Sequence, residues 1–425
     1  MREYCISSSF LGVVFSARVA FSKRSWPFVP ALVLPWLLCA GQRCLTRLAA
    51  LGSLRRHLSS YYRFLSDGKF RMDAFFRSLF ELIVRTFPTG ILAVVLDDTL
   101  VPHWGRGIFG TGSFFDHVRR PRPGFIWGHN WVVLAVVVQA GPVAWVALPF
   151  WVSLYRPRKS CPRGAFRTRH ELALEALAAV RLWYAGPILL LADGAYNNRS
   201  LVRPLRKLEI HLVSRLRSDA CLRAARIPRQ PKGKRGRKPK WGPCLPSLRT
   251  MARQRRAFRE KTVAIYGRSV TLLLREVVAW WPPLGCLVKV VITRDPRRPR
   301  RVAYLMTTDL DLSPVQVVEW FSRRWPVEQL FSVAKTQLGF DSAEVRTERA
   351  VTRHAALTLA LVTWVEVWWH QIHPRARART FAHKLGALRE AAVRDMVFAS
   401  GPRTRRSRRN SGTIGSLFRV ATAAA

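Results

Sequence analysis

Residues 188–213 read ILLLADGAYNNRSLVRPLRKLEIHLV and contain a strand, a helix and a second strand in close succession. The five apolar residues at 188–192 predict a buried strand, which Asp193 closes. A helix is predicted over 198–208, and the residues at 210–213 predict the next strand. This alternation is typical of an α/β protein whose helices lie against a sheet.

The segments before this unit extend the pattern. Short runs rich in β-branched residues at 91–96, 131–138 and 143–154 predict three strands of an antiparallel meander, and a helix is expected at 168–184. Strand, strand, strand, helix, strand, helix, strand is the element order of the RNase H-like fold, a mixed sheet with flanking helices. Because the fourth strand of such a sheet lies beside the first, Asp97 and Asp193 are expected at neighbouring strand ends.

The composition divides the chain into five parts. We expect a helical N-terminal region at 1–88, the first part of the core at 89–217, a β-rich insertion with a basic arm at 218–308, the last helices of the core at 309–375, and a basic C-terminal region at 376–425, mobile at its end. Within the insertion, strands are predicted at 262–266, 269–278 and 286–293, whereas the Gly, Pro, Lys and Arg residues of 228–243 predict a loop.

A third acid follows the insertion, in FSRRWPVEQLFSVAK at residues 321–335. A helix is predicted to begin at Ser313 and Pro314, with Gln316 completing the N-terminal cap. At about 100° per residue, four of its side chains fall within roughly 60° of one another. They are Phe321, Arg324, Glu328 and Lys335. Pro326 is expected to kink or break this helix.

Three carboxylates, those of Asp97, Asp193 and Glu328, could therefore converge. Such a triad can hold two Mg²⁺ or Mn²⁺ ions for phosphoryl transfer on DNA. Asp98 is the rival of Asp97, but alternation along the strand lets only one of them face the site, and we favour Asp97. Arg324 and Lys335 are expected to hold DNA phosphates; their alternative role is ion pairing on the helix face.

The charge points to a nucleic-acid partner. The chain has 71 Lys and Arg against 25 Asp and Glu, a formal charge of +46. Lys and Arg gain sequence-independent affinity by releasing counterions from phosphates, so DNA is the expected partner. The arm from Lys232 to Lys240 is expected to follow the DNA backbone or to enter a minor groove, although it could be an unbound linker. Its cations are Lys232, Lys234, Arg235, Arg237 and Lys238.

The cysteines and the apolar segments indicate the compartment in which the protein is expected. The seven cysteines are scattered without a C-x-x-C pair, so neither a disulfide framework nor a structural zinc site is expected. The apolar run at 27–40 is short and interrupted by proline, so no membrane span is expected. No signal-peptide cleavage site follows it, and a cytoplasmic location is expected.

The spacing aromatic-x2-Arg-x3-Glu-x6-Lys of Phe321, Arg324, Glu328 and Lys335 resembles the Y-R-E-K signature of DDE transposases from bacterial insertion sequences. Leu96-Asp97-Asp98-Thr99 and Ala192-Asp193-Gly194-Ala195-Tyr196 are similar to the two aspartate motifs of that family. The chain departs from the signature at Phe321, where the hydroxyl of the family's tyrosine is lost.

This resemblance implies a nucleoid-associated bacterial enzyme with two Mg²⁺ or Mn²⁺ ions. A homodimer would synapse two element ends, cut them, and join each 3′ end to target DNA. In relatives with a β insertion, cleavage can pass through a DNA hairpin while a tryptophan holds a flipped base, which leaves Trp241, Trp280 and Trp281 as candidates. Two alternatives stay open: a non-catalytic DNA-binding protein, decayed or domesticated from a transposase, and an RNase H-like nuclease that cuts without joining.

Overall fold

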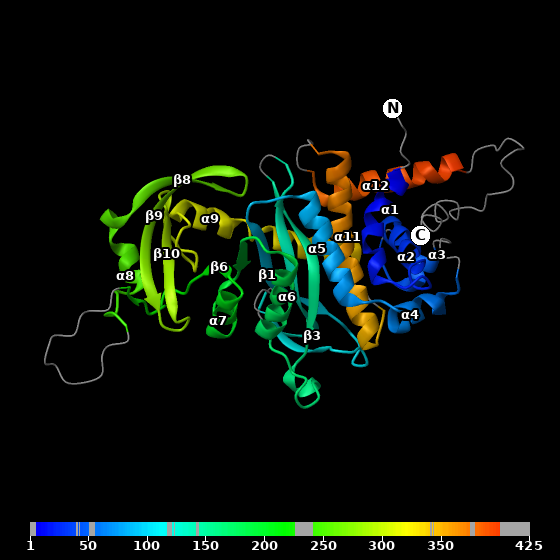
Figure 1. The fold of residues 1–425 in the computed structure, drawn as a ribbon, viewed down its shortest axis with the longest axis horizontal. Helices are drawn as coiled ribbons and strands as arrows, with labels where there is room; N and C mark the ends of the chain where they lie inside the picture. Colours follow the sequence, from blue (N-terminus) through cyan, green and yellow to red (C-terminus); the bar gives the residue numbers. More distant parts are fainter. Residues whose placement is uncertain are drawn as a thin grey trace, which may run out of the picture.

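The structure is a computed structural model that describes residues 6–39, 41, 43–50, 56–116, 121–122, 124–141, 144–225, 241–340, 342, 344–374 and 379–399. Its N-terminal region is helical, as the sequence predicts. The elements there are α1 (Ile6–Phe15), the 3₁₀ helix η1 (Ser16–Ala20), α2 (Phe28–Leu38), α3 (Leu45–Ala50), α4 (Leu58–Asp67) and α5 (Met72–Thr86). They form one end of an elongated molecule (Figure 1).

The centre of the molecule is a mixed sheet built around β1 (Leu92–Pro102). The long strand β3 (Gly124–Gln139) pairs antiparallel with β1 on one side, and β5 (Ile188–Ala192) pairs parallel with it on the other. β4 (Trp145–Tyr155) pairs with β3, and β6 (Ile210–Arg215) runs parallel to β5. This is the RNase H-like arrangement that the element order predicts. The strand β2 (Gly112–Asp116), which pairs with β3, was not predicted.

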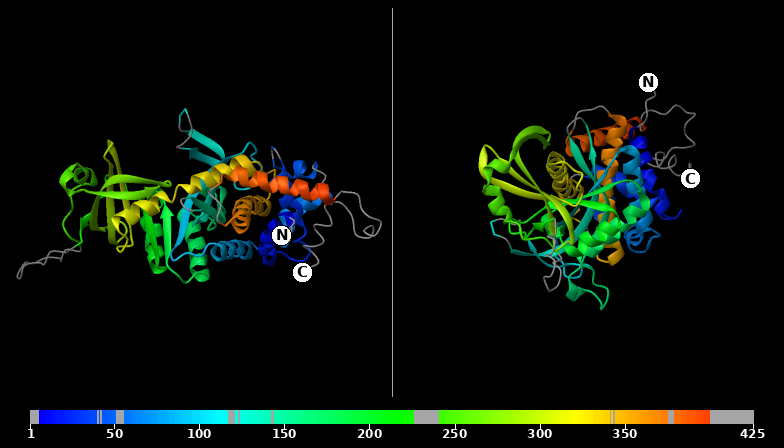
Figure 2. Two further views of the ribbon diagram at one scale, coloured as in Figure 1. Left: turned by 90° about the horizontal axis from the view of Figure 1, so that it is seen from above. Right: turned by 60° about the vertical axis from the view of Figure 1, so that its left-hand side comes forward.

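Helices cover the sheet. α6 (Arg169–Trp183) contacts β3 and β4, and α7 (Arg199–Lys207) contacts β6. Thr168 and Glu171 form a capping box that fixes the start of α6. The buried helix α11 (Glu348–Ile372) lies along β4, and α12 (Phe381–Ala399) packs on α1 and α11 near the N-terminal helices (Figure 2).

The β-rich insertion continues the core sheet. After the short β7 (Arg223–Ala224) and α8 (Leu248–Arg253) come β8 (Arg259–Ile265), β9 (Arg268–Trp281), β10 (Cys286–Asp295) and β11 (Arg298–Thr307). β11 pairs antiparallel with β6, so a single 11-stranded sheet runs through both parts. The insertion occupies the end of the molecule opposite α12 (Figures 1 and 2).

The helix predicted to carry all four residues of the stripe is two helices, so that prediction is wrong in part. α9 (Pro314–Ser322) begins with the predicted capping box, and α10 (Pro326–Leu338) follows after a turn at Arg323–Trp325. Proline lacks an N–H, and its ring clashes with the carbonyl four residues earlier, which here belongs to Ser322. Pro326 therefore opens a new helix, as the predicted break allowed.

None of the helices in the described ranges is both long enough and apolar enough to span a bilayer. The apolar run at 27–40 contains α2, whose side chains are almost all buried in the protein.

Candidate active site

Asp97 lies within β1, which runs on to Pro102, so the prediction that it stands at a strand end is wrong, whereas Asp193 directly follows β5. β1 and β5 pair in parallel up to Leu96 and Ala192, and both aspartates are the next residues. Residues in register on adjacent strands point to the same face of a sheet. The two carboxylates are close enough that the charge of Asp193 contributes to a raised pKa of Asp97.

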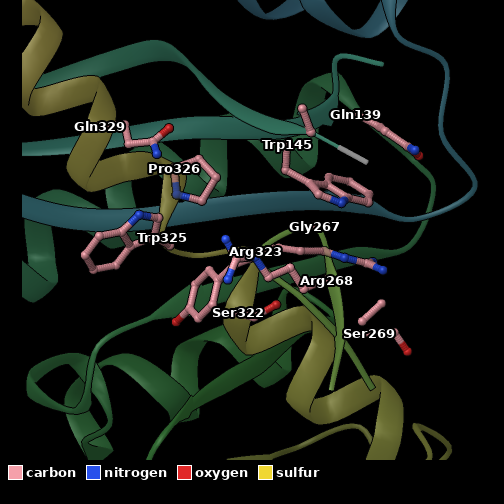
Figure 3. A pocket seen from close by; sticks show the side chains of 13 residues that line it. Gln139, Trp145, Gly267, Arg268, Ser269, Ser322, Arg323, Trp325, Pro326 and Gln329 are labelled. Carbon is pink, nitrogen blue, oxygen red and sulfur yellow. The ribbon is translucent and has the colours of Figure 1, made fainter. Parts of the chain in front are cut away.

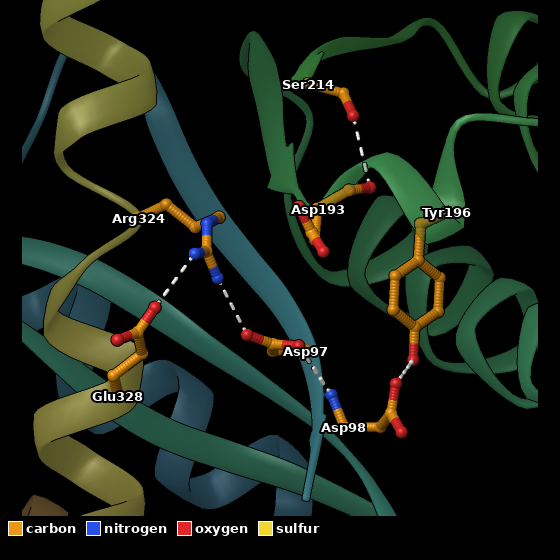
Figure 4. Close-up of polar contacts among 7 residues, drawn as sticks. All are labelled: Asp97, Asp98, Asp193, Tyr196, Ser214, Arg324 and Glu328. Carbon is orange, nitrogen blue, oxygen red and sulfur yellow. Dashed lines mark hydrogen bonds and ion pairs between the residues drawn. The ribbon is translucent and has the colours of Figure 1, made fainter. Parts of the chain in front are cut away.

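Arg324 joins Asp97 to Glu328. Its Nη1 donates to Asp97 Oδ2 at 2.8 Å, and its Nη2 donates to Glu328 Oε1 at 2.9 Å (Figure 4). The Arg324 side chain is only 16% exposed, so both charge-assisted bonds lie in a partly desolvated setting. The turn between α9 and α10 places this guanidinium between an acid of the sheet and an acid of the helix.

Asp98 points to the other face of β1. One of its carboxylate oxygens accepts a hydrogen bond from Tyr196 Oη at 3.0 Å, and the other pairs with Arg169 Nη1 at 2.8 Å. Burial, together with the charge of Asp98, holds the pKa of Tyr196 well above its ordinary value, so this phenol remains a donor. Asp98 is thus engaged on the α6 side of the sheet, while Asp97 faces Arg324.

The backbone around Asp193 is fixed from two sides. Ser214 Oγ, on β6, donates to the Asp193 carbonyl at 3.1 Å, and the Tyr196 N–H donates to the same oxygen at 3.0 Å. Figure 4 shows the Asp193 side chain between these groups and Asp97. The loop after β5 therefore carries both Asp193 and the tyrosine that anchors Asp98.

The positive charge near Asp97 does not fully offset the cost of burying its carboxylate. Burial raises the pKa of Asp97 to about 6, although the Arg324 guanidinium opposes that shift. Desolvation outweighs the attraction of one cation here. Additional positive charge near Asp97 would stabilise its ionised form.

The other two residues of the stripe lie close by. Lys335 Nζ donates to the Leu100 carbonyl at 2.7 Å, which fixes α10 to β1 three residues beyond Asp97. Phe321 is half-buried and packs on the core, with its ring centroid 6.0 Å from the Arg324 guanidinium carbon. Its ring packs near the Arg324 side chain.

An open pocket of about 1020 Å³ lies between the β8–β9 turn, the ends of β3 and β4, and the turn that follows α9 (Figure 3). The turn between β8 and β9 lines it with Tyr266, and the turn between α9 and α10 lines it with Arg323 and Trp325. The Tyr266 and Trp325 rings are 65% and 43% exposed, with centroids 6.0 Å apart. Sequence reasoning missed both, although Trp325 directly follows Arg324.

The tryptophans singled out in the insertion are less accessible or lie elsewhere. Trp281 is buried, Trp280 lies half-buried beside Cys286 in a second pocket, and Trp241 is exposed under Arg223. The cations predicted in the arm lie outside the described residues, as do residues 400–425 of the basic tail. The arm cations are Lys232, Lys234, Arg235, Arg237 and Lys238.

Comparison with known families decides the broad class. Residues 19–271, more than half of the chain, match the family described as DDE superfamily endonuclease. The chain belongs to the DDE superfamily endonucleases. The matched segment contains Asp97 and Asp193 but ends before Glu328. No curated protein matches the chain significantly.

DDE superfamily endonucleases normally use divalent metals. The donors here fit that use, because the three acids offer only carboxylate oxygens, which Mg²⁺ and Mn²⁺ prefer. The raised pKa of Asp97 also indicates that more positive charge would be favourable. Across the described ranges, however, no three His, Cys, Asp or Glu side chains already stand together as a metal site. Arg324 occupies the position between Asp97 and Glu328.

Proposed function

We propose that this DDE superfamily endonuclease is a transposase that cuts DNA at the ends of an insertion sequence and transfers the ends to target DNA. The observation that supports the proposal is that Asp97 and Glu328 pair with the same guanidinium, that of Arg324, while Asp193 follows the strand that lies beside Asp97. The three acids come from β1, β5 and α10, and 231 positions separate the first acid from the last (328 − 97).

Asp97, Asp193 and Glu328 would hold two Mg²⁺ or Mn²⁺ ions. When bound, such a pair activates the attacking oxygen and stabilises the leaving oxygen of a phosphodiester. The role that we propose for Arg324 follows from its contacts in this structure. Once the carboxylates have other cations, its two N–H groups are released for a DNA phosphate, which suits the planar fork of a guanidinium. Lys335 holds α10 against β1, which fixes the position of Glu328 relative to Asp97.

The pocket at the turn between α9 and α10 supports a role for unpaired DNA. Tyr266 has a φ of 52°, a backbone conformation that is unfavourable for a bulky side chain. Gly267 also has a positive φ, so Tyr266 and Gly267 form the two-residue turn of the β8–β9 hairpin, and this turn lines the pocket. Glu319, on α9, accepts a hydrogen bond from the Ala264 N–H at 2.9 Å and so ties this turn to the helix before Arg324. We propose that an unstacked base lies against Tyr266 and Trp325.

The test uses the full chain and duplexes taken from the DNA that flanks its coding region, with Mg²⁺ or Mn²⁺. We expect nicked DNA and joined strand-transfer products. Asp97→Asn, Asp193→Asn and Glu328→Gln should each lower the cleavage rate at least about a thousandfold, since each removes several kcal/mol of transition-state stabilisation. Denaturing gels of the same reactions would reveal a hairpin intermediate.

Asp219→Asn is the matched control, because Asp219 is an exposed acid paired only with Arg217 among the salt bridges of the described chain. It should cut like the wild type. Cleavage without joined products would indicate the nuclease that only cuts. Salt-sensitive DNA binding with no cleavage under any metal would indicate the non-catalytic alternative and would contradict the proposal.

We further propose that two copies act together, since each element has two ends. The partner would be a second copy of this chain, acting in the bacterial cytoplasm on nucleoid DNA. Light scattering with and without end duplexes measures this stoichiometry.

A further inference from the structure

The β2–β3 hairpin displays aromatic rings where a solvent-facing strand surface normally displays polar side chains. Burial alternates along β2 and along the first four residues of β3, which pair with it, so that one face there is covered and the other is open. The open face holds Phe115, Phe125 and Trp127, which are 43%, 68% and 39% exposed. Phe115 lies directly opposite Phe125, and their rings form an edge-to-face pair at 5.2 Å.

These rings lie on the same side of the sheet as Asp97. The pairing of β1 with β3 runs without a register shift from Asp97 and Val133 to Pro102 and Gly128. Because partners in register share a face and side chains alternate along a strand, the odd-numbered residues of β3 from Val133 back to Phe125 face the way Asp97 does.

The distance along this face suits a DNA duplex. Trp127 is six residues from Val133 and Phe125 is eight, which at about 3.4 Å per residue gives roughly 20 and 27 Å. A duplex that lies along this face with its scissile phosphate at Asp97 rises about 3.4 Å per base pair, so it would reach the rings roughly six to eight base pairs from the cut.

The charge of the surrounding segment selects DNA over a second protein surface. Residues 103–128 contain four arginines and one acid, Asp116. Arg106 and Arg122 are exposed in the structure, and Trp104 is fully exposed. Trp127 Nε1 donates to the Gly105 carbonyl at 3.2 Å, which holds that loop against the hairpin. Protein interfaces are depleted of charge at their centres, whereas exposed arginines in the same segment as exposed aromatic rings match a phosphate backbone and its bases.

We propose that Phe125 and Trp127 form an aromatic wedge that unstacks a base step of the duplex being cut, about six to eight base pairs from the scissile phosphate. The inference rests on the proposed function, because it takes the DNA at Asp97 as its reference point. Apolar and aromatic side chains inserted in this way distort the duplex and stack on the exposed base.

The test is 2-aminopurine fluorescence, which rises when a base is unstacked. End duplexes carry the probe at single positions up to twelve base pairs on either side of the cleavage point, and binding is measured without divalent metal. The wild type should raise the signal at about six to eight base pairs on one side. Phe125→Thr with Trp127→Thr, which keeps β-branched residues in the strand, should abolish that rise and weaken binding about tenfold.

Leu182→Ser is the matched control, because Leu182 is 86% exposed on α6 and carries no part of the wedge. It should bind and unstack DNA like the wild type. An unchanged signal and affinity in the folded double variant would overturn the inference. So would loss of dimers with unchanged DNA affinity, since the rings would then be a subunit contact. Failure to cleave, with the fluorescence rise intact, would count against the proposed catalysis and leave the wedge standing.

Discussion

Arg324 is the residue on which the chemistry of the site depends. It neutralises Asp97 and Glu328 at 2.8 and 2.9 Å in the arrangement seen here. Two divalent ions and this guanidinium cannot all share the space between the same carboxylates. Ion binding by Asp97 and Glu328, as proposed above, would therefore release Arg324, and the energy of its two bonds would be subtracted from the affinity for the ions.

We predict that Arg324→Gln responds more strongly to metal than the wild type does. Without the guanidinium, two carboxylates face each other, so the metal-free variant should lose about 1–3 kcal/mol of unfolding free energy. Mn²⁺ should then raise its melting temperature further than it raises that of the wild type. Thermal unfolding with and without Mn²⁺ measures both effects.

Arg323→Gln provides the control. Arg323 is packed between the Trp145 and Trp320 rings at 4.2 and 4.1 Å and bonds neither Asp97 nor Glu328. Its loss should destabilise the protein without enlarging the response to Mn²⁺. Equal Mn²⁺ shifts in the wild type and in Arg324→Gln would show that Arg324 does not compete with the ions.

Sequence reasoning named Arg324, and its alternative role of ion pairing on the helix face is seen in the pair with Glu328, but the contact of Arg324 with Asp97 was not predicted. Strand alternation predicted that only one residue of the Asp97–Asp98 pair faces the site, and the structure turns Asp98 toward Arg169 and Tyr196. The contact of Arg324 with Asp97 spans 227 residues and depends on the turn before Pro326. No local periodicity encodes a side-chain direction that a three-residue turn sets.

Among the elements, the strands and caps were predicted best because their signals are local. β5, α6, α7 and β6 follow apolar runs and capping residues that lie within each element. β2 was missed because it has only five residues and an exposed aromatic face, so it lacks alternation of apolar with polar residues. The break between α9 and α10 was foreseen at Pro326, yet its consequence for Arg324 was not.

The helix α11 contains a buried titratable group outside the site. His354 is 3% exposed, its ring centroid lies 4.9 Å from that of Trp36, and burial lowers its pKa to about 3. The unfolded chain binds a proton at His354 below about pH 6.5, whereas the folded chain does so only near pH 3. Its contribution to stability is therefore present above pH 6.5 and is lost as the pH falls toward 3.

The variant His354→Phe keeps an aromatic ring beside Trp36 but has no titratable group there. When the pH is lowered from 7 to 5, we predict that the unfolding free energy of the wild type falls by about 2 kcal/mol more than that of the variant. Urea unfolding at the two pH values gives this difference. Burial also lowers the pKa of His129, to about 4, but His129 is present in both proteins. Its contribution to the pH dependence is therefore the same in both and does not affect the difference. Identical pH dependence in the two proteins would mean that His354 stays protonated inside the helix layer or is not buried.

At the scale of the whole molecule, one sheet connects the catalytic core to the insertion. β11 pairs with β6 through Leu305, Met306 and Thr307, and β6 is the neighbour of the strand that ends at Asp193. The pocket with Tyr266 and Trp325 lies where the insertion, α9 and the core meet (Figure 3). The fold thus gathers the acids, the pocket and the exposed rings of the hairpin from segments far apart in the sequence.

The central claim is that Asp97, Asp193 and Glu328 bind the same cations. Fe²⁺ in place of Mg²⁺, with ascorbate and peroxide, cuts a polypeptide next to the residues that hold the ion. We predict cuts near 97, 193 and 328 that excess Mg²⁺ suppresses, that Asp97→Asn removes and that Asp98→Asn retains. Cuts that survive Asp97→Asn, or that spare the segment around 328, would contradict the account.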